Sequence, residues 1–202
     1  RLLLPSLSSL TFGLFLFDAN LDGYLDVFCV NGHVQTDIEL VDRQIRYRQP
    51  VHLFLNAGDG TFRDVAPELG PPLTQPLAGR GGAYGDFDRD SDLDVVLVEN
   101  GGGVHLWRND LPDPASKSLR ISLAPTRSNR EAIGARVRVH AGGRVQEQQR
   151  KGGGSYLSTS EKTLTFGLAG WPAVDSVVVF WPSGARTVHR DVASGAVTLR
   201  EE

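Results

Sequence analysis

Residues 18–26 read Asp-Ala-Asn-Leu-Asp-Gly-Tyr-Leu-Asp, and residues 86–94 read Asp-Phe-Asp-Arg-Asp-Ser-Asp-Leu-Asp. Each stretch places an oxygen-bearing side chain at loop positions 1, 3, 5 and 9. In a tightly curled loop these side chains converge, and the carbonyl of the seventh residue adds a further oxygen. Six to eight oxygens at about 2.3–2.6 Å suit Ca²⁺. The predicted ligands are the side chains of Asp18, Asn20, Asp22, Asp26, Asp86, Asp88, Asp90 and Asp94, and the carbonyls of Tyr24 and Asp92.

These loops differ from EF-hand loops, which close with a bidentate Glu at position 12. Here position 12 is Cys29 or Leu97, and each loop runs into a short apolar segment typical of a β-strand, residues 25–30 and 93–98. Asp, Asn and Gly also cluster in ordinary turns. Two loops with one spacing, each followed by a strand, favour the calcium interpretation over plain turns.

The two loops are not equivalent at position 6, where a positive φ lets the chain curl around an ion. Gly23 suits this position, whereas Ser91 must be held in a strained turn or the loop must relax. The second loop has four carboxylates where the first has three and an Asn. The higher charge of the second loop favours tighter calcium binding, whereas its geometry favours weaker binding. The sequence leaves open which of the two loops binds calcium more tightly.

The loops belong to a repeat. They are offset by 68 residues, as are Gly13 and Gly81, and residues 53–56 (Leu-Phe-Leu-Asn) match residues 106–109 (Leu-Trp-Arg-Asn) at an offset of 53. The first repeat therefore contains an insertion between Asn31 and Pro50. Each repeat is predicted to be a meander of about four strands, as in a propeller blade. Since propellers close with roughly four to eight blades, we expect the chain to be the carboxy-terminal piece of a longer one.

A proline-rich boundary, Asp110-Leu-Pro-Asp-Pro114, ends the repeats. Beyond it, segments such as Ile133–Val139 alternate apolar and charged residues, which predicts strands with one buried and one wet face. We therefore predict an all-β chain, with two propeller blades over residues 1–112 and a small β-sandwich-like domain over residues 116–202.

The charge pattern differs between the two parts. Residues 1–115 have 8 Lys/Arg and 17 Asp/Glu, net −9, and residues 116–202 have 13 and 7, net +6. The basic residues are scattered along strands without clustered aromatics, so no nucleic-acid partner is predicted. Cys29 forms no disulfide within the chain and is interpreted as a core residue. The apolar segment 1–17 is too short and interrupted for a transmembrane span, and it lacks a signal-peptide cleavage site.

Both parts resemble known families. The acidic loops together with residues 53–62 (Leu-Phe-Leu-Asn-Ala-Gly-Asp-Gly-Thr-Phe) resemble FG-GAP (VCBS-like) repeats. Residues 133–139, 152–158 and 181–184 (Trp-Pro-Ser-Gly) look like the ASPIC/UnbV domain. The order of the two is similar to that in the cartilage acidic protein family. The resemblance implies a secreted, calcium-binding, extracellular or cell-envelope protein whose ligand residues are those predicted above.

We therefore predict a non-enzymatic interaction or adhesion protein whose blades are stiffened by Ca²⁺, with an unknown protein or glycan ligand at the cell surface or matrix. No catalytic motif such as a nucleophile elbow or phosphate loop is present. Two alternatives remain. One is a propeller enzyme acting on polysaccharide, with His33, Asp37, Glu39 and Asp42 as its acid/base cluster. The other is a carbohydrate-binding module that stacks sugars on Trp107, Trp171 or Trp181.

Overall fold

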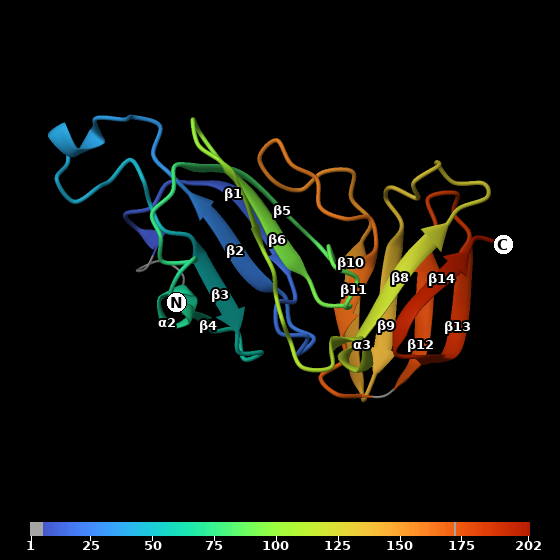
Figure 1. Cartoon of the computed structure of the whole chain (residues 1–202). Helices are drawn as coiled ribbons and strands as arrows, with labels where there is room; N and C mark the ends of the chain where they lie inside the picture. Colours follow the sequence, from blue (N-terminus) through green and yellow to red (C-terminus); the bar gives the residue numbers. More distant parts are fainter. Residues whose placement is uncertain (1–5, 172) are drawn as a thin grey trace.

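The computed structural model describes residues 6–171 and 173–202. Across these residues the strands form four β-sheets, and the chain runs from a pair of blade-like sheets to a pair of facing sheets that form a sandwich (Figure 1). The all-β fold predicted from the sequence is confirmed. The boundaries at residues 112 and 116 stay a prediction.

The first blade is an antiparallel meander of four strands in sequence order: β1 (Thr11–Phe17), β2 (Asp26–Asn31), β3 (His52–Asn56) and β4 (Phe62–Asp64). Side chains alternate along β1, where Phe15 and Phe17 are buried and Leu14 and Leu16 are each 46% exposed. Cys29 is buried within β2, as predicted, and burial raises the pKa of its thiol to about 11.

The second blade is a sheet of three strands in the described chain: β5 (Gly79–Gly85), β6 (Asp94–Glu99) and β7 (Val104–Trp107). The prediction of about four strands therefore holds for the first repeat and overestimates the second. The physical reason lies in Pro112 and Pro114, because proline lacks the N–H that a fourth strand would donate to β7. The chain instead turns into the short helix α3 (Pro114–Lys117) and the sandwich.

The two blades pack face to face. Phe15 stacks on Phe28 at 5.2 Å between ring centroids, and Phe17 stacks on Tyr84 of β5 at 5.6 Å. Val95 and Leu97 of β6 complete this core. Aromatic pairs at these separations add to the hydrophobic free energy of burial, so the blades hold each other in one orientation.

The sandwich consists of two sheets. One has the order β10 (Arg144–Gln149), β9 (Arg136–Ala141), β12 (Ala173–Phe180) and β13 (Arg186–Ala193); the other has the order β11 (Leu164–Gly167), β8 (Ser118–Ala124) and β14 (Gly195–Arg200). Strands β8 and β14 run parallel, and the other neighbours are antiparallel. Their inward side chains, including Ile121, Val139, Phe166 and Val179, are fully buried, which confirms the predicted sandwich.

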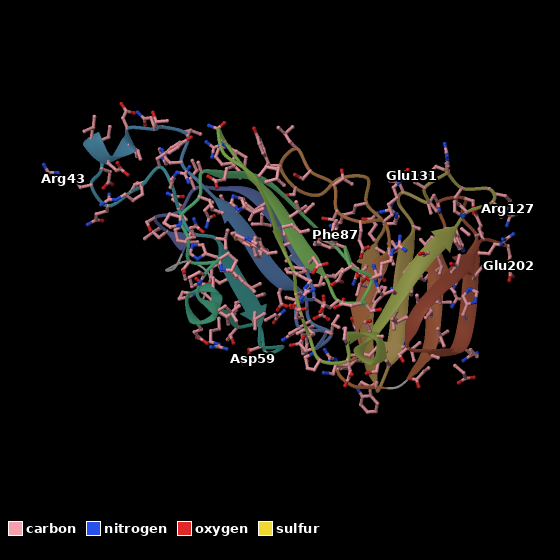
Figure 2. The ribbon with its side chains drawn as sticks, in the orientation of Figure 1. Arg43, Asp59, Phe87, Arg127, Glu131 and Glu202 are labelled. Carbon is pink, nitrogen blue, oxygen red and sulfur yellow. The ribbon has the colours of Figure 1, made fainter. Side chains whose placement is uncertain are left out.

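The insertion in the first repeat projects away from the body of the molecule (Figure 1). It contains one 3₁₀ turn, η1 (Ile38–Leu40), and its Arg43 lies at the opposite end of the molecule from Glu202 (Figure 2). The remaining short helix, α2 (Ala66–Leu69), follows β4. The hydrogen bonds and ion pairs that surround the acidic loops come from the blades and the sandwich, as described below.

Candidate metal centre at the domain junction

The first acidic loop connects β1 to β2 and is closed by its own carboxylates. Asp18 accepts hydrogen bonds from the backbone N–H groups of Asp22 at 3.1 Å and Gly23 at 2.8 Å. Asp26 accepts one from the N–H of Ala19 at 2.9 Å. The first and last residues of the loop are thereby drawn together, and Asp18 and Asp26 are almost completely buried.

The second loop, between β5 and β6, repeats this frame at each equivalent position. Asp86 accepts from the N–H groups of Asp90 at 3.1 Å and Ser91 at 3.2 Å, and Asp94 accepts from the N–H of Phe87 at 2.8 Å. Phe87 itself is 72% exposed (Figure 2). Two loops separated by 68 residues thus fold into one hydrogen-bonded form, which ordinary turns do not require.

Backbone angles decide between the two alternatives for Ser91. In the first loop, Leu21 and Gly23 have φ of 58° and 85°, and in the second, Arg89 and Ser91 have φ of 68° and 88°. The second loop therefore keeps the curl of the first, with Ser91 in a conformation that favours glycine.

Carboxylate oxygens converge in the second loop. One oxygen from each of Asp86, Asp88 and Asp94 lies within 4.8 Å of the others, an arrangement that can hold a metal ion. The buried side chain of Asp92 accepts a hydrogen bond from the N–H of Leu111 at 2.9 Å through Oδ2, and its Oδ1 has no hydrogen-bond partner among the described residues. In the first loop, the amide of Asn20 donates to Asp22 at 2.9 Å. The oxygen donors of both loops fit a hard cation such as Ca²⁺.

Burial makes these carboxylates unfavourable as bare anions. It raises the pKa of Asp18 to about 7, opposed by the hydrogen bond from Gly23 and reinforced by the charges of Asp22 and Asp26. Burial likewise raises the pKa of Asp26 to about 6 and that of Asp92 to about 7. A bound cation would reverse this effect by favouring the ionised forms.

Two asparagines outside the loops donate hydrogen bonds to the last predicted ligand of each loop, Asp26 and Asp94. The N–H of Asn56 at the end of β3 donates to Asp26 at 2.8 Å, and the N–H of Asn109 after β7 donates to Asp94 at 2.8 Å. Asn109 also donates its amide to the carbonyl of Ala19 at 2.9 Å and so links the two loops. Sequence reasoning assigned neither residue to the site, although both end the matched segments 53–56 and 106–109.

The sandwich contacts the second loop through Arg120 of β8. Its guanidinium forms an ion pair with Asp86, whose side chain is fully buried, and a second ion pair with Glu161 at 2.8 Å. The hydroxyl of Ser118 donates to the carbonyl of Ser91 at 3.2 Å. A predicted metal ligand therefore has a cationic partner from the other domain, which no sequence pattern had indicated.

The sandwich contacts the first loop as well. Arg144 of β10 donates to the carbonyl of Asp22 at 3.1 Å and lies over the ring of Tyr24, 4.0 Å from its centroid. The N–H of Ala169 donates to the carbonyl of Leu21 at 3.1 Å. Gly167 approaches so closely that a Cβ there would collide with Asp18 and Leu21. Both acidic loops therefore lie at the junction of the two domains.

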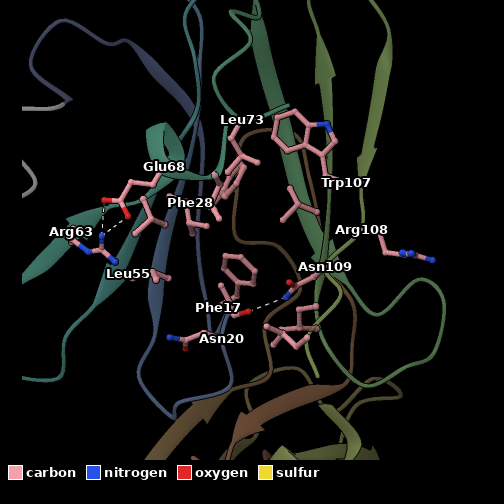
Figure 3. A pocket seen from close by; sticks show the side chains of 17 residues that line it. Phe17, Asn20, Phe28, Leu55, Arg63, Glu68, Leu73, Trp107, Arg108 and Asn109 are labelled. Carbon is pink, nitrogen blue, oxygen red and sulfur yellow. Dashed lines mark hydrogen bonds and ion pairs between the residues drawn. The ribbon is translucent and has the colours of Figure 1, made fainter. Parts of the chain in front are cut away.

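An apolar cavity of about 450 Å³ lies between the blades (Figure 3). Trp107 and Leu73 line one end of it, and Phe17 lies near Asn109 at the other. Of the other tryptophans, Trp181 is buried in the sandwich and donates to Thr187 at 3.0 Å. Trp171 is 47% exposed. The burial of Trp181 argues against stacking of a sugar on it, whereas stacking on Trp107 or Trp171 stays a prediction.

The acid/base cluster considered for a polysaccharide enzyme is dispersed on the insertion. Asp37, Glu39 and Asp42 are exposed, and the ring of His33 accepts a hydrogen bond from the N–H of Gln35 at 3.1 Å. Among the described residues, no hydrogen bond or ion pair connects His33 with these carboxylates. The geometry gives no support to their joint action in proton transfer.

Comparison with known families agrees with both parts of the fold. The FG-GAP-like repeat model matches residues 18–97, which contain both acidic loops, and the ASPIC and UnbV model matches residues 125–202. Residues 18–97 are therefore similar to an FG-GAP-like repeat, and residues 125–202 to an ASPIC/UnbV domain. It is a distant homologue of cartilage acidic protein 1 from Homo sapiens, with 29% identity over 173 residues. The match covers 79% of this chain and 25% of that protein, so the chain spans about a quarter of its relative's length.

Proposed function

We propose that this protein is a non-enzymatic, extracellular or cell-envelope interaction protein that binds Ca²⁺ in its two acidic loops. The proposed ligands are the side chains of Asp18, Asn20, Asp22, Asp26, Asp86, Asp88, Asp90 and Asp94, with the carbonyls of Tyr24 and Asp92. The observation that carries the proposal is the shared hydrogen-bonded frame of the two loops, together with the convergence of Asp86, Asp88 and Asp94 within 4.8 Å.

The calcium affinity expected of such loops supports the proposed location. Calcium sites of extracellular modules bind at about 0.1–1 mM, far above the calcium concentration of the cytosol. Loops of this kind are therefore filled only where calcium is abundant. The FG-GAP-like repeat and the distant homologue support an extracellular placement. No helix in the described part of the chain is long and apolar enough to cross a bilayer.

The role of the ion is to fix the junction. Both loops contact the sandwich, through Arg120 and Ser118 at the second loop and through Arg144 and Ala169 at the first. Neutralising the carboxylates stiffens the loops, and the stiffened loops hold the two domains in one relative orientation. A protein or glycan ligand at the cell surface or matrix would then meet a preformed surface, which lowers the entropic cost of binding.

Thermal unfolding with calcium and with a chelator tests the proposal. If each site binds at about 0.1 mM, about 1 mM calcium adds roughly 1.4 kcal/mol per site. For a protein of this size that corresponds to about 3–6 °C per site. Asp88→Ala leaves no side-chain oxygen at loop position 3 and should remove the shift due to the second loop. Asp42→Ala, on the exposed insertion, is the matched control and should leave it intact. Identical midpoints in calcium and chelator would refute the proposal.

A further inference from the structure

A second cavity, of about 510 Å³, lies between the inner strand of the first blade and the sandwich. Leu14 and Leu16 of β1 form its blade wall, and Arg150, Lys151 and Ser160 lie on the sandwich wall. Its volume falls within the range of small-molecule sites, about 300–1,000 Å³. The neutral polar groups that line it include Gln149, Thr159 and Ser160, which suit a ligand rich in hydroxyl groups.

Arg150 is the unusual residue of this cleft. It is only 5% exposed, and within residues 6–171 and 173–202 no carboxylate forms an ion pair with it. Its guanidinium has five N–H donors, and the hydrogen bond found for it is from Nη1 to the carbonyl of Lys151 at 3.1 Å. Burying a cation without a counter-ion is costly. An oxyanion in the cleft would remove that cost.

The backbone holds Arg150 in a fixed position. Its N–H donates to the carbonyl of Ala135 at 2.8 Å, and its carbonyl accepts from the N–H of Gly134 at 2.9 Å. Burial lowers the pKa of the guanidinium, an effect opposed by the nearby Glu131 and Tyr84. An arginine stays protonated in spite of such a shift. The cleft therefore contains a rigidly placed, permanent positive charge.

The acidic residues of the cleft already have partners. Glu147 pairs with Arg138 at 2.6 Å and with Arg136 at 3.4 Å, and Glu161 pairs with Arg120 at 2.8 Å. Asp18 accepts the backbone hydrogen bonds of the first loop. Lys151 is exposed and, like Arg150, forms no ion pair in the described part of the chain. The two unpaired charges on this wall are thus both positive.

We propose that this cleft binds an acidic saccharide, with the oxyanion of a carboxylate or sulfate group held by Arg150 and Lys151 and the sugar hydroxyls facing Gln149, Thr159 and Ser160. Arginine is suited to this task because its planar donors match a carboxylate or sulfate in a bidentate manner. The proposal rests on the interaction role proposed above and names a ligand class for it, although its cations are not metal-loop residues.

Titration calorimetry of the full chain, in calcium and again in chelator, tests the proposal. The probes are D-glucuronate, N-acetylglucosamine 6-sulfate and D-glucose. Both acidic sugars should bind, and D-glucose should bind at least tenfold more weakly. The stronger of the acidic probes identifies the preferred oxyanion. Arg150→Gln should weaken acidic-sugar binding by about 10- to 100-fold, as expected for the loss of a charge-assisted hydrogen bond.

Two further variants make the result decisive. Arg190→Gln removes the same charge from β13, at the opposite edge of the sheet from β10, and should leave the affinity unchanged. Lys151→Gln changes an exposed residue, so it keeps the fold even if Arg150→Gln does not, and it should also weaken binding. The proposal is overturned if neither acidic sugar binds, or if D-glucose binds equally well. It is also overturned if Arg150→Gln binds acidic sugars as tightly as Arg190→Gln does. Where Arg150→Gln does not fold, the same comparison is made with Lys151→Gln.

The outcomes also separate this proposal from the calcium proposal. Acidic-sugar binding without any calcium-dependent rise in the unfolding midpoint would refute the metal sites and leave the cleft standing. A calcium-dependent midpoint without sugar binding would refute the cleft alone.

Discussion

Replacing Arg120 with methionine should destabilise the metal-free protein about twice as much as the calcium-loaded protein. Arg120 is the cation that faces the fully buried carboxylate of Asp86, and its own side chain is only 13% exposed. Methionine keeps much of the apolar stem and removes the charge. In the absence of metal, the substitution leaves Asp86 as a buried anion without its partner, whereas a bound Ca²⁺ supplies a new one.

Breaking a buried ion pair by removing one partner costs about 3–5 kcal/mol. For a chain of this length, about 3 kcal/mol corresponds to a fall of about 6–12 °C in the unfolding midpoint. We expect that fall in chelator, and about half of it in about 1 mM calcium, because the ion restores a cationic neighbour to Asp86. By linkage, the variant should also bind calcium more tightly than the parent chain.

The assay is calorimetric unfolding with and without calcium, joined to a calcium titration. Arg138→Met is the matched control, since Arg138 also forms a short ion pair, 2.6 Å from Glu147, but with side chains 39% and 34% exposed. Such an exposed pair contributes about 0–1 kcal/mol, so the control should shift little and equally in both conditions. A loss for Arg120→Met that is the same in calcium and chelator would refute the reasoning.

The other predictions concern strain and acid stability. Ser91→Gly should relieve the strain of a φ of 88° and stabilise the protein by about 0.5–1 kcal/mol after the unfolded-state entropy of glycine is included. Gly23→Ala, at a φ of 85°, should destabilise the protein. Both free energies are measured by urea unfolding, and equal effects of the two substitutions would contradict this prediction. Burial raises the pKa of Glu201, but hydrogen bonds from Ser183, Ser128 and Arg127 outweigh it and hold that pKa well below the ordinary value of 4.5. Its stabilising contribution is therefore present above pH 4.5 and lost as the pH falls further, so Glu201→Gln should lower the neutral-pH midpoint and flatten its acid dependence. An unchanged acid dependence would show that other groups are responsible.

The relation between the loops and the sandwich has a consequence for interaction. Arg120 and Arg144 each reach a different loop, so both loops are in direct contact with the sandwich. The cleft around Arg150 lies between the same two domains. The relative orientation of the domains therefore sets the width of the cleft, and under the proposed function calcium bound in the acidic loops would fix that orientation.

Local sequence determined the elements of this protein. The nine-residue spacing predicted two equivalent loops followed by strands, and the alternating residues of the second part predicted a sandwich, because side-chain periodicity reports which face of a strand is buried. The same local pattern left open whether Ser91 is held in a strained turn or the loop relaxes, and the backbone angles show the strained turn. It overestimated the second blade, where prolines after Trp107 end the meander. The ligand roles and the domain boundaries stay predictions.

Tertiary structure alone decided what surrounds the loops. Asp86 and Arg120 are 34 residues apart and Asp22 and Arg144 are 122 apart, so neither pair leaves a periodic trace in the sequence. Gly167 gives no local signal either. Only glycine fits there because Asp18 packs against it in the folded protein, where a Cβ would collide with Asp18. The lack of an ion-pair partner for Arg150 in the described chain likewise depends on the fold. The fold decides which carboxylates lie near Arg150 and which of them pair with other cations. Local periodicity specifies strands and turns, whereas the pairing of charges across a domain junction is fixed only when the sheets pack.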